Sequence, residues 1–299
     1  MEQKPLVSVI IPTYKRPVFL DRAINSVLQQ TYPNIEIIVV DDNNPGTEGR
    51  SLTEKIMEGY KDIPNVYYIK HEHNKNGSAA RNTGAYYSKG SYIAFLDDDD
   101  QYLPKKIESQ VNMLESLSED WGFCYNKYYT QRGDEKPELV DEKRQGDLYL
   151  NALMHKGFCV NLGSNVLIRR KAFEAVHGFD ETFKRNQDHE IMVRLLRLYK
   201  IAYVSEPGLI YSVGTTNVSI DYEETVDHYV EAFKPYVDEL DKKQKKEFDI
   251  SINNYRFVNY LRAHNYNKAL KLLLKGRLPL WKAISTFTRY SFMYVKRRL

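Results

Sequence analysis

Residues 92–100 read Tyr-Ile-Ala-Phe-Leu-Asp-Asp-Asp-Asp, an apolar run followed directly by four carboxylates. The run 92–96 has the length and the aromatic and β-branched character of a buried strand, which places Asp97–Asp100 where that strand reaches the surface. Four adjacent anions repel one another, and a partly desolvated cleft screens that repulsion poorly. We therefore expect a cation there. A hard divalent ion that shares substrate phosphates is the first candidate, and a solvated acidic loop is the alternative.

The sequence on the amino-terminal side of this run alternates strand and helix patterns. Strands are expected over 6–12, 35–40 and 66–69, and helices over 20–28, 48–60 and 78–88. Such alternation predicts a largely parallel sheet that is covered by helices on both faces. Right-handed crossovers bring the carboxyl ends of these strands to one edge, where open α/β sheets bind ligands. Asp41-Asp42 and Asp97–Asp100 should therefore meet at one cleft.

Beyond residue 120 the pattern is less regular. A polar loop is expected over 131–146, a strand over 158–168, and a helix that begins at Asp188. After Tyr222 the chain reads as helices alone. We therefore predict an α/β domain over 1–219 and a basic helical region over 220–299.

Positive charge is concentrated at the carboxyl end. From Ser251 to Leu299 there are eleven Lys and Arg residues and no Asp or Glu. In the segment 280–295, one helical face carries Leu280, Ile284, Phe287, Ser291, Tyr294 and Val295, and the other carries Lys282, Arg289 and Lys296. An interfacial helix on anionic lipid shows this pattern, and so does a surface helix packed on its own domain. Residues 277–299 are thus a candidate for contact with an anionic membrane surface, whereas no recognition motif indicates nucleic acid.

Composition is that of a globular protein, with 42% hydrophobic and 28% charged residues in 299. Cys124 and Cys159 are the only cysteines, which favours a reducing compartment over a disulfide scaffold. The first residues lack the apolar core of a signal peptide, and no apolar run has the length of a membrane span. We expect a cytoplasmic protein, with peripheral contact to the inner face of the cell membrane as a further possibility.

The common phosphate-loop, dinucleotide and hydrolase motifs are missing. His71 and His73 have no further Cys or His nearby and are interpreted as surface residues. The acidic sheet edge is accompanied by Arg81 and Asp188, each at the start of a helix. A metal on the acidic run would neutralise a departing diphosphate, and an isolated later carboxylate would accept the proton of an incoming hydroxyl. This set predicts group transfer from a nucleotide diphosphate.

Five stretches, in this order, resemble family 2 of the glycosyltransferases, whose members have the GT-A fold. They are VSVIIPTYKRP at 7–17, SVLQQTYPNIEIIVVDDNN at 26–44, GSAARNTGAYYSKGSYIAFLDDDD at 77–100, GSNVLIRRKAFEAVHGFDE at 163–181 and NQDHEIMVRL at 186–195. The resemblance covers roughly residues 6–215. It implies a mixed, mainly parallel sheet flanked by helices, with the carboxyl-terminal helices as an extension.

The resemblance also implies a role for each matching residue. Asp42 would read the edge of the uracil, Asp99 would bind Mn²⁺ or Mg²⁺ together with Asp97, and Asp188 would be the general base. Asp100 would support the metal ligands. The residues expected to bind the donor are Pro12, Thr13, Tyr14, Asp41, Asp42, Arg81, Asp97 and Asp98.

The implied reaction inverts the anomeric centre of a sugar that leaves a nucleotide diphosphate, with UDP favoured by Asp42. The acceptor would be a hydroxyl of a glycan or a lipid-linked molecule in surface polysaccharide synthesis. Two departures from the family pattern stand out. Gln187 precedes Asp188 where many members have Glu, and Tyr211–Gly214 contains no His as a third metal ligand. The Q-x-x-R-W signature of processive synthases is missing, which favours a single addition.

Each of these residues also has an interpretation without catalysis. Asp42 could hold a turn, Arg81 could form a surface ion pair, and Asp188 could cap its helix. For the whole chain, the alternatives are a catalytically inactive family member that acts as a scaffold or partner subunit, and a nucleotidyltransferase. A phosphoreceiver is a third alternative, although its acidic pair would be expected on the first strand.

Overall fold

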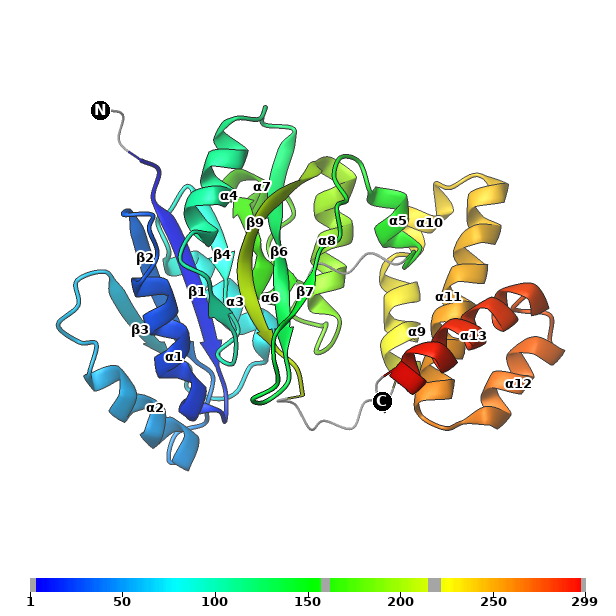
Figure 1. Ribbon diagram of the computed structural model, residues 1–299, viewed down its shortest axis with the longest axis horizontal. Coiled ribbons are helices and arrows are strands. Elements are labelled where there is room, and N and C mark those ends of the chain that lie inside the picture. The colour runs from blue at the N-terminus through cyan, green and yellow to red at the C-terminus, as the bar shows by residue number, and fades with distance from the viewer. Residues whose placement is uncertain (1–3, 157–161, 215–221, 297–299) are drawn as a thin grey trace. The chain divides into compact units, whose positions relative to one another are not determined.

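The computed structural model describes residues 4–156, 162–214 and 222–296 (Figure 1). The chain divides into two compact units. The first comprises Met1–Tyr149 and Cys159–Asn217, and the second comprises Leu150–Phe158 and Val218–Leu299. The later division lies two residues from the predicted boundary between 219 and 220. Local sequence patterns gave no indication that Leu150–Phe158 belongs with the carboxyl-terminal helices.

The described part of the first unit is built on one nine-stranded sheet. Its strands are β1 (Val7–Thr13), β2 (Ile35–Asp41), β3 (Val66–Lys70), β4 (Tyr92–Phe95), β5 (Gln101–Tyr102), β6 (Trp121–Gln131), β7 (Glu138–Val140), β8 (Val166–Arg169) and β9 (Lys200–Ser212). Their spatial order is β3-β2-β1-β4-β8-β6-β9-β5, with β7 paired to β6. The first four strands are parallel, as predicted, and the antiparallel strand β8 joins them to the second half. The sheet is therefore mixed.

Helices cover both faces of this sheet. Those of the first unit are α1 (Pro17–Leu28), α2 (Glu48–Glu58), α3 (Gly77–Tyr87), α4 (Lys106–Glu115), α6 (Leu162–Asn165), α7 (Arg170–Ala175) and α8 (Gln187–Leu198). Side chains alternate along β1, so Val9 packs with Ile24 of α1 while Ile10 faces α3. An added Cβ at Gly84 would lie 2.4 Å from Ile10 Cγ2, so this glycine allows α3 to approach the sheet closely.

The strand predicted over 158–168 is wrong for residues 162–165. Helix α6 occupies Leu162–Asn165, and β8 begins only at Val166. Residues 158–161 lie outside the described residues. The cause is the polar segment between Gly163 and Asn165. Asn165 Nδ2 donates to the Asn126 carbonyl at 2.7 Å, and Gln110 Nε2 donates to the Asn165 carbonyl at 2.7 Å. These buried side-chain bonds satisfy the backbone where a strand ladder would otherwise do so.

The second unit is helical (Figure 1, where α5 is green and its other helices run from yellow to red). Its helices are α5 (Tyr149–Leu153), which starts at the end of the first unit, α9 (Tyr222–Ala232), α10 (Lys234–Asp238), α11 (Lys242–Arg262), α12 (Tyr266–Leu274) and α13 (Leu280–Lys296). A small core joins Phe257 and Leu261 of α11 to Ala269, Leu272, Leu278 and Ala283. Among the described residues, no helix is both long and apolar enough to cross a membrane.

One hydrogen bond and two ring contacts attach Leu150–Phe158 to this unit. Tyr229 donates from its hydroxyl to the Leu153 carbonyl at 2.9 Å. The His155 ring stacks on Tyr255 with 4.6 Å between centroids and meets Tyr229 edge-on. The segment is therefore an insertion between β7 and β8 whose partners come from much later in the chain.

Candidate active site

The acidic run Asp97–Asp100 lies between β4 and β5, at the carboxyl edge of the parallel strands. The Asp100 amide donates to the Asp97 carbonyl at 3.0 Å, which closes the run into a turn. Asp98, Asp99 and Asp100 are buried, and Asp97 is partly exposed. Asp97, Asp99 and Asp100 each offer one carboxylate oxygen within 4.8 Å of the others. The solvated-loop alternative therefore does not describe this run.

Two serines hold the run in this shape. Ser164 of α6 donates to Asp100 Oδ2 at 2.5 Å and accepts from the Asp97 amide at 3.0 Å. The Ser212 amide donates to Asp100 Oδ1 at 2.9 Å. Burial raises the pKa of Asp100 well above its usual range. Sequence patterns did not identify either serine, because each meets Asp100 only through the tertiary fold.

Asp98 points toward β1. Thr13 Oγ1 donates to Asp98 Oδ2 at 2.8 Å, and Arg16 Nη2 lies 2.8 Å from Oδ1. Burial raises the pKa of Asp98 to about 7, against the opposing effect of the Arg16 charge. The Thr13 carbonyl accepts the Asp42 amide at 3.0 Å. Thr13 therefore contacts both acidic clusters, which meet at one edge as predicted.

Two arginines bring positive charge to the acidic run. Arg16 Nη1 forms an ion pair with Asp99 Oδ2, and Arg22 Nη2 donates to the Asp99 carbonyl at 2.5 Å. Neither arginine was among the predicted site residues. The available signal was the position of Arg16, three residues after the end of β1 and before the first turn of α1.

Asp42 supports the loop that leads into α3. Its two oxygens contact four groups, namely His71 Nδ1 at 2.7 Å, Asn74 Nδ2 at 2.7 Å, the Lys75 amide at 2.8 Å and the Asn76 amide at 3.0 Å. Four partners occupy the acceptor sites of a carboxylate. The interpretation of His71 as a surface residue is wrong, because its ring is buried between Asp42 and Thr83.

Asp41 is also engaged within the protein. It accepts from the Tyr68 hydroxyl at 2.6 Å and from the Asn43 amide at 2.9 Å, and it pairs with Arg50 Nε at 3.1 Å. Both residues of the Asp41-Asp42 pair thus order the segments beside the strand ends. Contact of either carboxylate with a base is a prediction that this arrangement does not test.

A cavity of about 460 Å³ opens beside the end of β1. It is lined by Tyr14, Lys15, Pro17, Val18, Asn43, Asn44, Thr47, Glu48, Gly49 and Leu52. One aromatic ring, several aliphatic side chains and two amides suit a planar ligand with polar edges. Tyr14 therefore lines a cavity, and its contact with a nucleotide stays a prediction. Pro12 contributes its backbone to β1, opposite Val40.

Arg81 and Asp188 meet the acidic run from two helices. Arg81 is buried, and its Nη2 donates to Asp97 Oδ1 while Nη1 donates to the Gly77 carbonyl at 3.2 Å. The surface-ion-pair alternative for Arg81 is therefore wrong. Asp188 is the second residue of α8, and Asn186 occupies the cap position, so the capping alternative for Asp188 is wrong as well.

The Asp188 carboxylate is chemically unusual. Its Oδ1 is shielded from solvent and has no hydrogen-bond partner among the described residues. Burial raises the pKa of Asp188 to about 6, with the Arg81 charge lowering it and the Asp97 charge raising it again. Gly163 brings the two carboxylates near each other, since an added Cβ there would lie 2.9 Å from Asp97 Oδ2 and 3.3 Å from Asp188 Oδ2. A carboxylate with this pKa can accept a proton near neutral pH.

The donor set around the run suits a hard divalent cation. Such ions take carboxylate oxygens as ligands and commonly complete their shell with substrate phosphates. Asp97, Asp99 and Asp100 supply three such oxygens, so the third member of the group is Asp100, which was expected only to support the ligands. The residues present therefore fit Mn²⁺ or Mg²⁺.

Comparison with known proteins places this arrangement in context. A family model described as glycosyl transferase family 2 matches residues 8–176. An uncharacterised glycosyltransferase of Rickettsia prowazekii is 30% identical over 283 residues, which cover 90% of this chain and 84% of that protein. The Escherichia coli protein WfgD is named as a UDP-Glc:alpha-D-GlcNAc-diphosphoundecaprenol beta-1,3-glucosyltransferase. It is 36% identical over 123 residues, which cover 41% of this chain and 46% of WfgD.

Solved structures agree on the fold. S. aureus TarS in complex with UDP-GlcNAc superimposes with a TM-score of 0.59 at 15% identity, covering 91% of this chain and 92% of the TarS chain. TarS in complex with UDP gives a TM-score of 0.57 at 16% identity, with the same coverage. The sheet and its helices are the GT-A fold, and the chain belongs to family 2 of the glycosyltransferases.

Proposed function

We propose that this glycosyltransferase is inverting and metal-dependent, and that it transfers a single sugar from a UDP-sugar to a hydroxyl of a glycan or lipid-linked acceptor. The observation that carries the proposal is the Asp188 carboxylate. Its Oδ1 is shielded from solvent and has no partner in the described part of the chain, and Asp188 lies across Gly163 from Asp97. A carboxylate oxygen in that position can accept a proton from a bound hydroxyl.

Asp188 is proposed as the general base. Its free Oδ1 would accept the proton of the acceptor hydroxyl while the hydroxyl oxygen forms a bond to the anomeric carbon and the bond from that carbon to the nucleotide diphosphate breaks. Arg81 would keep Asp188 ionised through its charge and would orient Asp97 through their hydrogen bond.

The leaving diphosphate is assigned to the acidic run. Asp97, Asp99 and Asp100 would hold Mn²⁺ or Mg²⁺, which when bound offsets the negative charge of a departing diphosphate. Arg16 and Arg22 lie at the same run, where Arg16 pairs with the Asp99 carboxylate and Arg22 donates to the Asp99 carbonyl. Arg16 would therefore contribute positive charge near the phosphates as well.

The nucleoside is assigned to the cavity beside β1. Tyr14 offers a ring for stacking, and Asn44 offers an amide to the edge of a base. Uridine is favoured because TarS has been solved with UDP and UDP-GlcNAc, and because the WfgD name specifies a UDP-Glc donor. The WfgD name also specifies a diphosphoundecaprenol acceptor, which supports a lipid-linked acceptor and work at the inner face of the cell membrane.

Calorimetric titration tests these assignments together. UDP, GDP and dTDP would be titrated into wild type, Asp99→Asn and Asp62→Asn, with and without Mn²⁺. Asp62 is an exposed carboxylate after α2, so Asp62→Asn removes the same charge outside the site. We expect UDP to bind only with Mn²⁺, and the affinity to fall about tenfold or more in Asp99→Asn alone.

A UDP affinity that is the same with and without Mn²⁺ would contradict the metal assignment. Equal affinities for all three nucleotides would contradict the uridine assignment. Absence of binding by any nucleotide would favour the inactive partner-subunit alternative, which Gln187 in place of Glu already suggests.

A further inference from the structure

The two last helices expose an unusual amount of apolar surface. Seven large apolar side chains of α12 and α13 are between 52% and 77% exposed, namely Tyr266, Leu270, Leu274, Leu280, Trp281, Ile284 and Phe287. Tyr266, Leu270 and Leu274 are spaced by four residues along α12. Leu280, Ile284 and Phe287 are spaced by four and then three residues along α13, so they also share one helical face. Each helix therefore carries an exposed apolar stripe.

These stripes are distinct from the faces that hold the unit together. Ala269, Leu272, Leu278 and Ala283 are buried against Phe257 and Leu261 of α11. Thr286 Oγ1 donates to Asn254 Oδ1 of α11 at 2.6 Å, which orients the same face of α13 inward. Both helices thus satisfy their own packing with one side. The exposed stripes take no part in the core of this unit. Contiguous exposed apolar patches on proteins commonly mark an interaction site.

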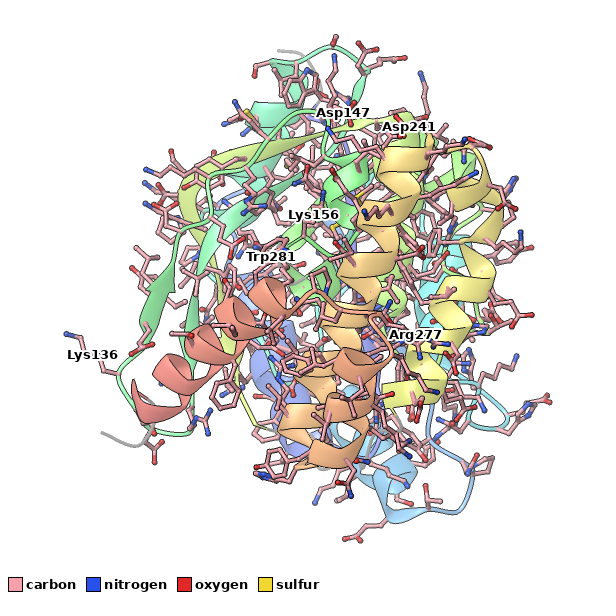
Figure 2. The ribbon with its side chains drawn as sticks, turned by 90° about the vertical axis from the view of Figure 1, so that its right-hand side faces the viewer. Lys136, Asp147, Lys156, Asp241, Arg277 and Trp281 are labelled. Atoms are coloured by element: carbon pink, nitrogen blue, oxygen red, sulfur yellow. The ribbon has the colours of Figure 1, made fainter. Side chains whose placement is uncertain are left out.

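Unpaired basic side chains accompany the stripes. Lys271, Lys275 and Arg277 are exposed and Lys282 is partly exposed, and no carboxylate of the described residues lies within ion-pair distance of them. Arg256 and Lys268 differ, because Asp227 and Glu223 of α9 neutralise them. Figure 2 shows Arg277 and Trp281 on the side of this unit that faces the viewer, at the turn into α13. The turn between the two apolar stripes is therefore strongly basic.

We propose that these residues form a surface that binds an anionic lipid bilayer. The membrane surface, as we define it, consists of the seven apolar residues together with Lys271, Lys275, Arg277 and Lys282. Aromatic and aliphatic side chains partition into the boundary between headgroups and acyl chains, while Lys and Arg contact lipid phosphates. The surface begins at Tyr266, eleven residues earlier than the sequence-predicted segment 277–299, and the side chains after Thr288 lie outside its definition.

Charge argues against a second copy of the chain as the occupant. A two-fold contact between identical surfaces would bring Lys275 and Arg277 of one copy close to the same residues of the other. The segment from Ser251 to Leu299 holds no Asp or Glu to compensate them. An anionic bilayer supplies the missing negative charge and covers the apolar stripes at once. The proposal concerns binding alone and does not depend on the sugar-transfer reaction.

Vesicle flotation of the full chain tests the charged part of the surface. Wild type would be mixed with phosphatidylcholine vesicles, with or without about one third phosphatidylglycerol. The test variant is Lys275→Glu/Arg277→Glu, and the matched control is Lys242→Glu/Lys243→Glu. The control makes the same charge change at exposed positions in the first turn of α11.

We expect wild type and control to float with the anionic vesicles only, and less so as salt rises. Each basic side chain near an anionic surface contributes roughly fivefold to partitioning, so the test variant should bind at least about 25-fold more weakly.

A second pair of variants tests the apolar part. Leu274→Ser/Leu280→Ser removes two exposed leucines of the surface, and Leu139→Ser/Leu198→Ser removes two exposed leucines of the first unit. Only the first pair should reduce partitioning, by about tenfold or more. Because all four leucines are exposed, thermal unfolding should change little in either pair, so a loss of binding reports the surface itself.

Three results would overturn the proposal. One is equal flotation with neutral and anionic vesicles, and another is a wild type that floats with neither. The third is a wild-type dimer in sedimentation that Leu274→Ser/Leu280→Ser converts to monomer, since the surface would then join two copies. UDP binding is measured separately by calorimetry, so failure of vesicle binding leaves the proposed reaction untouched.

Discussion

Gly163 lies so close to Asp97 that a side chain at position 163 would have to displace the Asp97 carboxylate. An added Cβ would lie 2.9 Å from Asp97 Oδ2, closer than a methyl group and a carboxylate oxygen can approach. Gly163→Ala should therefore displace Asp97 and lower kcat by about tenfold to 100-fold, since small misplacements of reacting groups are costly. Steady-state rates on wild type and variant measure this. Gly59→Ala, at an exposed helix end, is the control and should keep wild-type kcat.

Proton uptake by Asp188 should set the acid limb of the activity profile. Burial raises the pKa of Asp188 to about 6, and only the ionised carboxylate can accept a proton. We expect kcat/KM to rise about tenfold per pH unit below 6 and to level off above it. Asp188→Asn should lower kcat by roughly 100-fold to 10,000-fold while calorimetric UDP affinity is retained. Lost UDP binding in Asp188→Asn would instead make this residue part of the donor site.

Arg81 should control the position of that acid limb. Its charge lowers the pKa of Asp188, so Arg81→Gln should move the midpoint of the kcat/KM profile to higher pH. Arg81→Lys keeps a positive charge and should move the midpoint less. Arg170→Gln is the matched control, because Arg170 donates to the Gly90 carbonyl and the Ser88 hydroxyl outside the site. An unchanged midpoint in Arg81→Gln would limit Arg81 to a structural role.

Removal of Arg16 should make the protein more responsive to divalent metal. Arg16 pairs with Asp98 and Asp99, and its side chain is 29% exposed, so its loss should destabilise the metal-free protein by about 1 kcal/mol. Mn²⁺ should restore more stability to Arg16→Gln than to wild type, because an added cation compensates the freed carboxylates. Urea unfolding in EDTA and in Mn²⁺ measures both differences. Equal Mn²⁺ effects in the two proteins would show that the metal binds away from Asp99.

Lys106 should make stability rise with pH just above neutrality. It is fully buried, its Nζ donates to Gln110 Oε1 at 2.8 Å, and burial lowers its pKa to about 7. Above pH 7 the unfolded chain keeps a proton that the folded protein has lost. The contribution of Lys106 to the free energy of unfolding should therefore rise with pH by at most about 1.4 kcal/mol per unit until the unfolded pKa is reached.

Urea titrations between pH 7.0 and 8.5 measure this slope. Cys124 acts in the opposite sense, because burial raises the pKa of its thiol to about 12, and its effect begins only near its usual value of 9. Lys106→Met should flatten the slope, whereas Lys105→Met, at the exposed neighbour, should retain it. A slope that survives Lys106→Met would assign the titration to another group.

Sequence patterns predicted the parallel half of the sheet because each element there is decided locally. Strand β2 and helix α1 carry clear periodicities, and β1 through β4 begin and end within about two residues of the expected positions. The second half is different, since β8 and β9 reach their partners across long loops. A four-residue strand such as Val166–Arg169 has too few residues to show a period, and its polar neighbours bond only through tertiary contacts.

The candidate site shows the same difference between features decided locally and features that depend on tertiary contacts. The acidic run and Asp188 could be found because unusual residue types stand at predicted element ends. Ser164, Ser212 and Arg16 could not, because a serine or an arginine in a loop is common and its partner is distant in sequence. Asp42 illustrates the reverse problem, since its carboxylate is engaged by four groups of the following loop. A motif locates such a residue but does not say which of its oxygens are available.

The insertion Leu150–Phe158 has a consequence for biosynthesis. Leu153 and the tyrosine that binds its carbonyl, Tyr229, are 76 residues apart. A ribosome that adds about 5–20 residues per second leaves roughly 4–15 s between them. During that interval the nascent chain holds an orphaned segment in the middle of its sheet-forming sequence. A chain that ends before Tyr229 would never acquire the partner of this segment. Such truncated chains should therefore aggregate instead of forming a smaller enzyme.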